Sequence, residues 1–313
     1  MDSSELVERL LRGERRALAR LLTRVEDGSV DRLREVVRLL HPHTGNAMLI
    51  GLTGSPGVGK STLTSALVAV WRGRGKRVAV LAVDPSSPFS GGALLGDRVR
   101  MQDHALDEGV FIRSMASRGH LGGLSWATPQ ALLVLDAAGF DVVVVETVGV
   151  GQAEVEIAST ADTTVVALAP GMGDAIQAAK AGILEIADVF VVNKADRDGA
   201  DRTVRELREM QKLGHGEWLA PVVKTIASTN DGVEELADAI EGHHAWLRDA
   251  GRLDERRLAR ARVQLRELAL GTIRDRFRKL GDGDLAEELA AAVAQRKTDP
   301  YSAADQLVAS LED

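Results

Sequence analysis

The sequence predicts an α/β protein with a mostly parallel central sheet flanked by helices, and with further helices before and after that sheet. Short apolar runs alternate with helical stretches through the middle of the chain, which is typical of βαβ units. The runs are continuously apolar, which indicates strands buried on both faces. In order, they read AMLIGLT, RVAVLAVD, VFIRS, FDVVVVET, TTVVALA, VFVVNK and PVVKTIA.

Bulk composition narrows the class of protein. The 313 residues include no cysteine, which excludes disulfides, thiolate metal sites and cysteine nucleophiles. The net charge of −7 argues against a general nucleic-acid or membrane-surface binder. No apolar run approaches the roughly 20 residues of a spanning helix, and early carboxylates such as Asp2 and Glu5 do not fit a signal or transit peptide. We therefore expect a cytoplasmic protein with no nucleic-acid or membrane partner.

Residues 1–45 are predicted to form an N-terminal helical segment. The Asp27-Gly28 pair ends a first helix that begins near residue 4, and a second helix ends before the His-Pro pair at 41–42. We expect this segment to pack on the main domain, and a surface for a partner is the alternative. Apolar residues of the first helix recur near helical spacing, at Leu6, Leu10, Leu18, Leu21 and Val25.

Residues 249–313 are predicted to form a C-terminal helical hairpin. The long charged helix RLARARVQLRELALGTIRDRFRKL is followed by the Gly-rich break GDGD at 281–284 and by one Ala-rich helix. A charged hairpin of this length buries little of itself within one chain, so dimerisation and packing on its own domain both remain open. The main domain, residues 46–248, contains the predicted sheet.

A phosphate-binding loop follows the first predicted strand. GSPGVGKS matches G-x-x-x-x-G-K-[ST] and lies between a strand and a helical pattern, as that motif requires. Glycines let backbone N–H groups point at phosphate, and a helix amino terminus favours an anion. We expect Lys60 to reach the β- and γ-phosphates and the Ser61 hydroxyl to bind Mg²⁺. The predicted contacts are Gly54, Ser55, Pro56, Gly57, Val58, Gly59, Lys60, Ser61 and Thr62.

The tetrapeptide NKAD at another strand end predicts guanine as the base. Asp196 is suited to accept from N1–H and N2–H₂ of guanine, whereas adenine has neither donor and would leave that carboxylate unpaired. Lys194 can lie along the base, and Asn193 can brace the loops. One strand later, TIASTNDG fits a backbone donor to the guanine O6, which we place at Ser228 beside Ala227.

Two further carboxylates end predicted strands, Asp84 in RVAVLAVD and Glu146 in FDVVVVE. The carboxyl ends of parallel strands meet at one edge, so either carboxylate can hold Mg²⁺, directly or through water. In ETVGVGQ, Glu146 and Gly149 are spaced as in D-x-x-G, which places the Gly149 N–H to bond the γ-phosphate. Val150 stands where Ras-like enzymes carry the water-orienting Gln, and Gln152 comes two residues late. We therefore expect slow hydrolysis alone and stimulation by a partner.

Longer segments resemble one family. DPSSPFSGGALLGDRVRM, ETVGVGQAEVEI and APGMGDAIQAAKAGILEIADVFVVNKAD, taken with GSPGVGKST, resemble the MeaB/ArgK group of SIMIBI-class P-loop GTPases from about Leu40 to Leu247. These GTPases are chaperones of adenosylcobalamin-dependent methylmalonyl-CoA mutase. The resemblance implies that GTP binding and hydrolysis gate cofactor loading onto an acyl-CoA mutase and protect that mutase from inactivation. It also implies a homodimer made by the C-terminal helices.

The same resemblance implies further site residues. Asp84, Asp97 and Glu146 would line the Mg²⁺ site with Ser61. Residues Gly171 to Ile183 would form a third switch. Gln177 and Lys180 would be the candidate polar residues of that switch. Together with Lys60, Glu146 and Gly149, which the motifs above predict, they complete the candidate catalytic residues.

Two other functions remain as alternatives. A metallochaperone GTPase usually carries Cys or His clusters, whereas here cysteine is absent and the pairs His41/His43 and His243/His244 are expected to be solvated surface residues. A small-molecule kinase would need an acceptor site and a base near the γ-phosphate. An older label for the family, arginine/ornithine transport kinase, receives little support because NKAD favours guanine over adenine.

Overall fold

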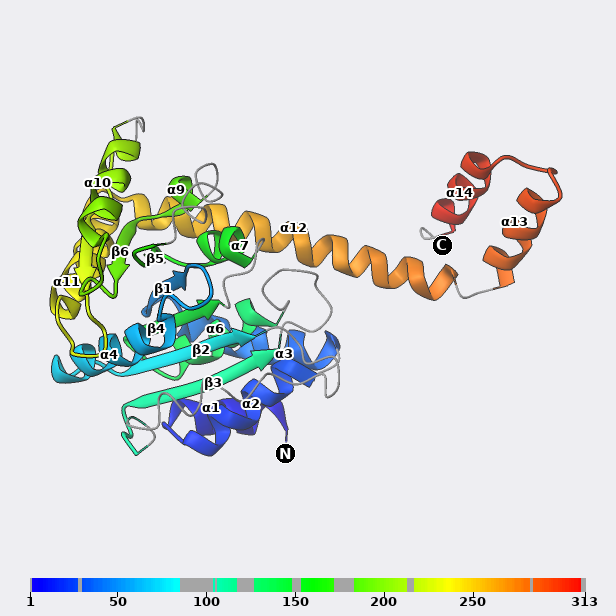
Figure 1. Cartoon of the computed structure of the whole chain (residues 1–313). Coiled ribbons are helices and arrows are strands. Elements are labelled where there is room, and N and C mark those ends of the chain that lie inside the picture. Colours follow the sequence, from blue (N-terminus) through cyan, green and yellow to red (C-terminus); the bar gives the residue numbers. More distant parts are fainter. Residues whose placement is uncertain are drawn as a thin grey trace. The chain divides into compact units, whose positions relative to one another are not determined.

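The computed structural model describes residues 2–27, 30–84, 104, 106–116, 127–147, 153–171, 183–212, 217–281 and 284–310 (Figure 1). The chain divides into two compact units, Met1–Leu253 and Asp254–Asp313. The first unit contains the sheet and the candidate site. The second contains most of the long C-terminal helix and the two helices that follow it.

A seven-stranded sheet is the centre of the first unit (Figure 1). Its order is β3-β2-β4-β1-β5-β6-β7, and every neighbouring pair is parallel. Each predicted apolar run is one of these strands, so the predicted α/β class is confirmed. The strands are β1 (Met48–Thr53), β2 (Val78–Asp84), β3 (Val110–Ala116), β4 (Val142–Thr147), β5 (Thr163–Leu168), β6 (Val189–Asn193) and β7 (Val222–Thr225).

Helices cover both faces of the sheet, which explains the continuously apolar strands. Alternate residues of one strand enter different cores: Ile50 of β1 packs in the core with Leu67 and Ile240, while Leu49 packs in the core with Leu135. The first face is covered by α4 (Lys60–Gly73) and α11 (Val233–Asp249), and the second by the N-terminal helices, α6 (Thr128–Ala137), α7 (Ala153–Thr160) and α10 (Ala200–Gln211). A four-residue helix, α9 (Ile183–Ile186), precedes β6.

The N-terminal helices pack on the sheet unit, as expected, but the first predicted helix is two. These are α1 (Ser3–Leu11) and α2 (Arg15–Asp27), followed by α3 (Val30–Leu40) and the short 3₁₀ helix His41–His43. Gly13 takes φ +85° and turns the chain between α1 and α2, because glycine has no Cβ that clashes in this region. Leu6 and Leu21 are completely or almost completely buried in the same core as Leu135.

The C-terminal unit is formed by most of α12 (Arg252–Gly281) and by α13 (Asp284–Ala294) and α14 (Pro300–Ala309). The prediction of one final Ala-rich helix is therefore wrong. Arg296 takes φ +59° and the Lys297 N–H donates to Ala292 O at 2.9 Å, which closes α13. Asp299 then accepts from two backbone N–H groups and caps α14, whose first residue is Pro300.

This unit exposes many apolar side chains. Among its described residues, Ala303 is the one hydrophobic residue that is buried. No helix of the described part of the chain is long and apolar enough to cross a membrane. The large exposed hydrophobic residues are Leu258, Val263, Leu265, Leu268, Ile273, Phe277, Leu285, Tyr301 and Val308.

Candidate nucleotide site

The loop between β1 and α4 is held tightly at the carboxyl edge of the sheet. Gly54 takes φ +141°, and a Cβ there would lie 2.1 Å from the carbonyl oxygen of Ala167 in β5. Gly59 takes φ +96°, and its Cβ would lie 2.6 Å from Asn193 Nδ2. Both positions therefore need glycine for conformation and for space.

Lys60 is the first residue of α4, and its ammonium lies over this loop. Its Nζ donates to Gly54 O at 2.6 Å and to Ser55 O at 3.2 Å, and the residue is buried. A helix amino terminus with a cation beside it attracts anions, since the amino-terminal end of the helix dipole and the cation are both positive. The loop is therefore suited to phosphate, the ligand predicted for it.

Glu146 joins the end of β4 to the first turn of α4. Ser61 Oγ donates to its Oε1 at 2.8 Å and Thr64 Oγ1 donates to its Oε2 at 3.1 Å, and all three residues are buried. A hard cation such as Mg²⁺ prefers a few oxygen ligands together with substrate phosphates. The described residues contain no cluster of three or more His, Cys, Asp or Glu side chains that would suit a metal held by protein alone. The hydroxyl and carboxylate pair fits Mg²⁺ shared with a nucleotide.

Asn193 links the phosphate loop to the loop after β7. Its Nδ2 donates to Val58 O at 2.9 Å, and its Oδ1 accepts from Thr225 Oγ1 and from Ala227 N, both at 3.1 Å. Asn193 is 2% exposed, so these bonds form in a water-poor environment. The predicted phosphate and base elements are therefore in direct contact.

The other predicted base-contacting residues lie around this link. Lys194 takes φ +57°, and its Nζ donates to Gly57 O at 2.6 Å. Asp196 is exposed in the turn before α10, and Ser228 is exposed in the turn after β7. The Ala195 N–H donates to Thr225 O at 3.0 Å and so joins these two turns.

Several predicted residues cannot be placed. Asp84 is the last residue of β2, but its side chain lies outside the described part of the chain. The other residues that the sequence analysis names around the metal, the γ-phosphate and the third switch lie outside the described ranges altogether: Asp97, Gly149, Val150, Gln152, Gln177 and Lys180.

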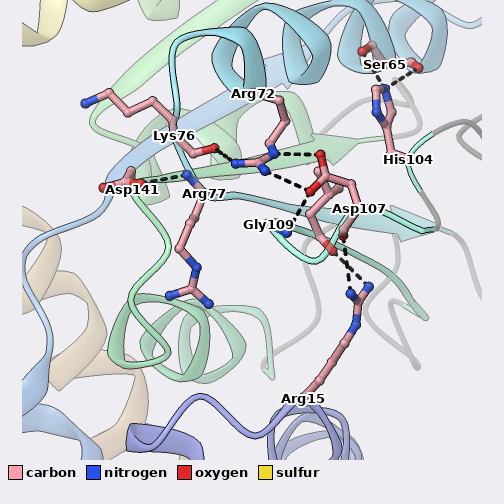
Figure 2. Close-up of polar contacts among 10 residues, drawn as sticks. Arg15, Ser65, Arg72, Lys76, Arg77, His104, Asp107, Gly109 and Asp141 are labelled. Atoms are coloured by element: carbon pink, nitrogen blue, oxygen red, sulfur yellow. Dashed lines mark hydrogen bonds and ion pairs between the residues drawn. The ribbon is translucent and has the colours of Figure 1, made fainter.

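A polar cluster that the sequence analysis missed ties the segment before β3 to α4 (Figure 2). Arg72 Nε donates to Asp107 Oδ2 at 2.8 Å, and the Gly109 N–H donates to Asp107 Oδ1 at 2.8 Å. The Arg72 guanidinium lowers the pKa of Asp107. One turn after Ser61, the Oγ of Ser65 lies 3.1 Å from His104 Nε2. No local pattern marks this cluster, because Arg72 and Asp107 are 35 positions apart and Ser65 and His104 are 39 positions apart.

The expectation of a solvated His243/His244 pair is wrong for His243, which is 1% exposed. Its Nδ1 lies 2.9 Å from Thr163 Oγ1, and its Nε2 lies 3.3 Å from Asp188 Oδ1. Packing of α11 on the starts of β5 and β6 buries this histidine. It is a structural residue at the sheet edge opposite the phosphate loop.

Comparisons with known proteins agree with this geometry. A family model described as "Methylmalonyl Co-A mutase-associated GTPase MeaB" matches residues 18–282. A predicted GTPase of Pyrococcus abyssi is 50% identical over 309 residues, which cover 97% of this chain and 95% of that protein. The mouse "Methylmalonic aciduria type A homolog, mitochondrial" is 33% identical over 86% of this chain and 69% of its own length. Among solved structures, an LAO/AO transport system kinase superposes with a TM-score of 0.71 at 30% identity, covering 99% of this chain and 98% of that one.

Proposed function

The chain belongs to the MeaB family of GTPases, and on this premise we propose that it is a GTP-dependent chaperone of an acyl-CoA mutase. In this proposal, GTP binding and hydrolysis gate the loading of adenosylcobalamin onto a mutase of the methylmalonyl-CoA type and protect that mutase from inactivation. Support for the client comes from the family's description and from the name of the mouse relative. We also propose that the protein works in the cytoplasm.

The observation that carries the nucleotide chemistry is the Asn193 bridge. Because one side chain bonds both Val58 of the phosphate loop and Ala227 beside the proposed base donor, the two ends of GTP would be bound by one connected structure. Asp196 would read guanine and Lys60 would contact the phosphates. Binding of the correct base would therefore order the loop where hydrolysis takes place.

Magnesium would be held by the Ser61 hydroxyl and, directly or through water, by Glu146. When bound, Mg²⁺ would neutralise charge on the phosphates. Asp84, at the end of β2, is a further candidate ligand, and family resemblance adds Asp97. The Gly149 N–H would bond the γ-phosphate, and family resemblance makes Gln177 and Lys180 the candidate polar residues of a third switch. No water-orienting Gln stands after Gly149, which supports slow hydrolysis alone and stimulation by the partner.

The C-terminal helices would form a homodimer arm. The apolar residues of α12, including Leu265, Ile273 and Phe277, are exposed, and the described residues of their own unit form no hydrophobic core that covers them. Exposed apolar surface of this extent is typical of an interface. A second copy of the chain would supply a matching surface by symmetry.

GTP turnover with and without the client tests the proposal. We expect the purified protein to hydrolyse GTP slowly and not to hydrolyse ATP. Its GTP hydrolysis should become faster when a cobalamin-dependent acyl-CoA mutase from the same source is added. Unchanged turnover with the mutase would contradict the chaperone role and direct the search to metalloenzyme clients. Phosphate transfer to a small molecule, rather than release to water, would instead indicate a kinase.

A further inference from the structure

Thr64 contacts the same carboxylate as the magnesium-binding hydroxyl. Glu146 presents one oxygen to each of two hydroxyls: Oε1 is 2.8 Å from Ser61 Oγ, and Oε2 is 3.1 Å from Thr64 Oγ1. Thr64 is completely buried, and Glu146 is 4% exposed. Only Ser61 belongs to the phosphate-loop motif, so the motif does not explain Thr64.

The geometry of α4 places both hydroxyls on one side. Ser61 and Thr64 are three residues apart, and residues at this spacing are neighbours on a helix surface. The Oγ1 of Thr64 also lies 3.0 Å from Lys60 O, a backbone contact that selects the rotamer of a β-branched side chain. The Thr64 side chain is therefore held in one rotamer, from which its hydroxyl contacts Glu146.

The chemistry requires the hydroxyl to be the donor. An ionised carboxylate only accepts hydrogen bonds, and a hydroxyl has one proton to give. Of the two acceptors near Thr64, an ionised carboxylate forms a stronger bond than a backbone carbonyl. Glu146 stands where D-x-x-G has Asp, so it carries one more methylene and one more torsion. A second hydroxyl can restrain that torsion.

We propose that Thr64 is a positioning residue, which holds the Glu146 carboxylate so that Oε1 faces Ser61 and the metal of bound nucleotide. This inference rests on the proposed Mg²⁺ site. Thr64 acts through Glu146 and touches neither nucleotide nor metal. Its loss would weaken the contribution of Mg²⁺ to nucleotide binding, and it would leave the contribution of the base unchanged.

The test compares Thr64→Val, Thr64→Ser and a matched control, Thr163→Val. Valine keeps the shape but removes the hydroxyl, and serine keeps the hydroxyl. Thr163 is also completely buried, and its Oγ1 lies 2.9 Å from His243 Nδ1 at the opposite sheet edge. GDP affinity is measured with a fluorescent GDP analogue over a series of Mg²⁺ concentrations and in EDTA, and circular dichroism checks folding.

We expect Thr64→Val to raise the Mg²⁺ concentration for half-maximal effect about tenfold, with GDP affinity in EDTA within twofold of the parent. For Thr64→Ser and Thr163→Val, both the half-maximal Mg²⁺ concentration and the GDP affinity in EDTA should stay within about threefold of the parent values. An equal loss with and without Mg²⁺ would show a general structural role and overturn the inference, as would an unchanged Mg²⁺ dependence. If Thr64→Val does not fold, Thr64→Ala is measured against the same limits. If the GDP affinity of the parent protein does not depend on the Mg²⁺ concentration, the metal site itself is refuted.

Discussion

Replacing Asn193 by alanine tests whether the bridge between the two loops is as important as its geometry indicates. The change removes the bonds to Val58 O, Thr225 Oγ1 and Ala227 N. The Thr225 hydroxyl can turn to another acceptor, but the backbone groups of Val58 and Ala227 cannot. Both residues are buried, at 0% and 6% exposure. A buried group left without its partner costs about 1–3 kcal/mol, so two such groups predict a loss of about 3 kcal/mol in unfolding free energy.

Urea unfolding followed by tryptophan fluorescence measures this loss. All four tryptophans precede residue 254, so the signal reports the Met1–Leu253 unit. Asn46→Ala, at an exposed side chain, is the control and should change the free energy by less than about 0.5 kcal/mol. Asn193→Asp keeps the acceptor but sets a carboxylate oxygen against Val58 O, and it should cost at least as much as alanine. A loss below about 1 kcal/mol for both Asn193 variants would refute the reasoning.

Three further outcomes follow from the structure. Asp196→Asn should lower GTP affinity by at least about tenfold and favour xanthosine triphosphate, whose C2 oxygen accepts from an amide; unchanged GTP affinity would remove Asp196 from base recognition. Arg72 lowers the pKa of Asp107 in the folded state, so the stability contributed by this pair is present at pH 7 and is lost as the pH falls below about 4. The difference in urea midpoint between the parent and Asp107→Asn should therefore shrink from pH 7 to pH 3, and a constant difference would contradict the pairing. Gly54→Ala should lower the thermal midpoint sharply because its Cβ would meet a β5 carbonyl at 2.1 Å, whereas Gly73→Ala, with nothing within 4 Å, should leave it unchanged or raise it.

The strands and the phosphate loop were predictable because their signals are local. A run such as VVVVET is buried on both faces and reads as a parallel strand wherever it lies in the sheet. The motif at Gly54 to Ser61 combines glycines at positive φ with a helix start, and both follow from neighbouring residues. Helix ends were less predictable, since Gly13 and Arg296 end helices through a single left-handed residue.

By itself, the sequence determined the fold class, the phosphate loop and the base motif, since each depends on residues within one short segment. Only the tertiary structure decided that Asn193 bonds Val58 and Ala227, that Thr64 reaches Glu146, and that His243 is buried. These contacts join residues from 34 to 135 positions apart, or depend on which helix covers which strand. Strand order and helix packing set such distances, and no local pattern of residues encodes them.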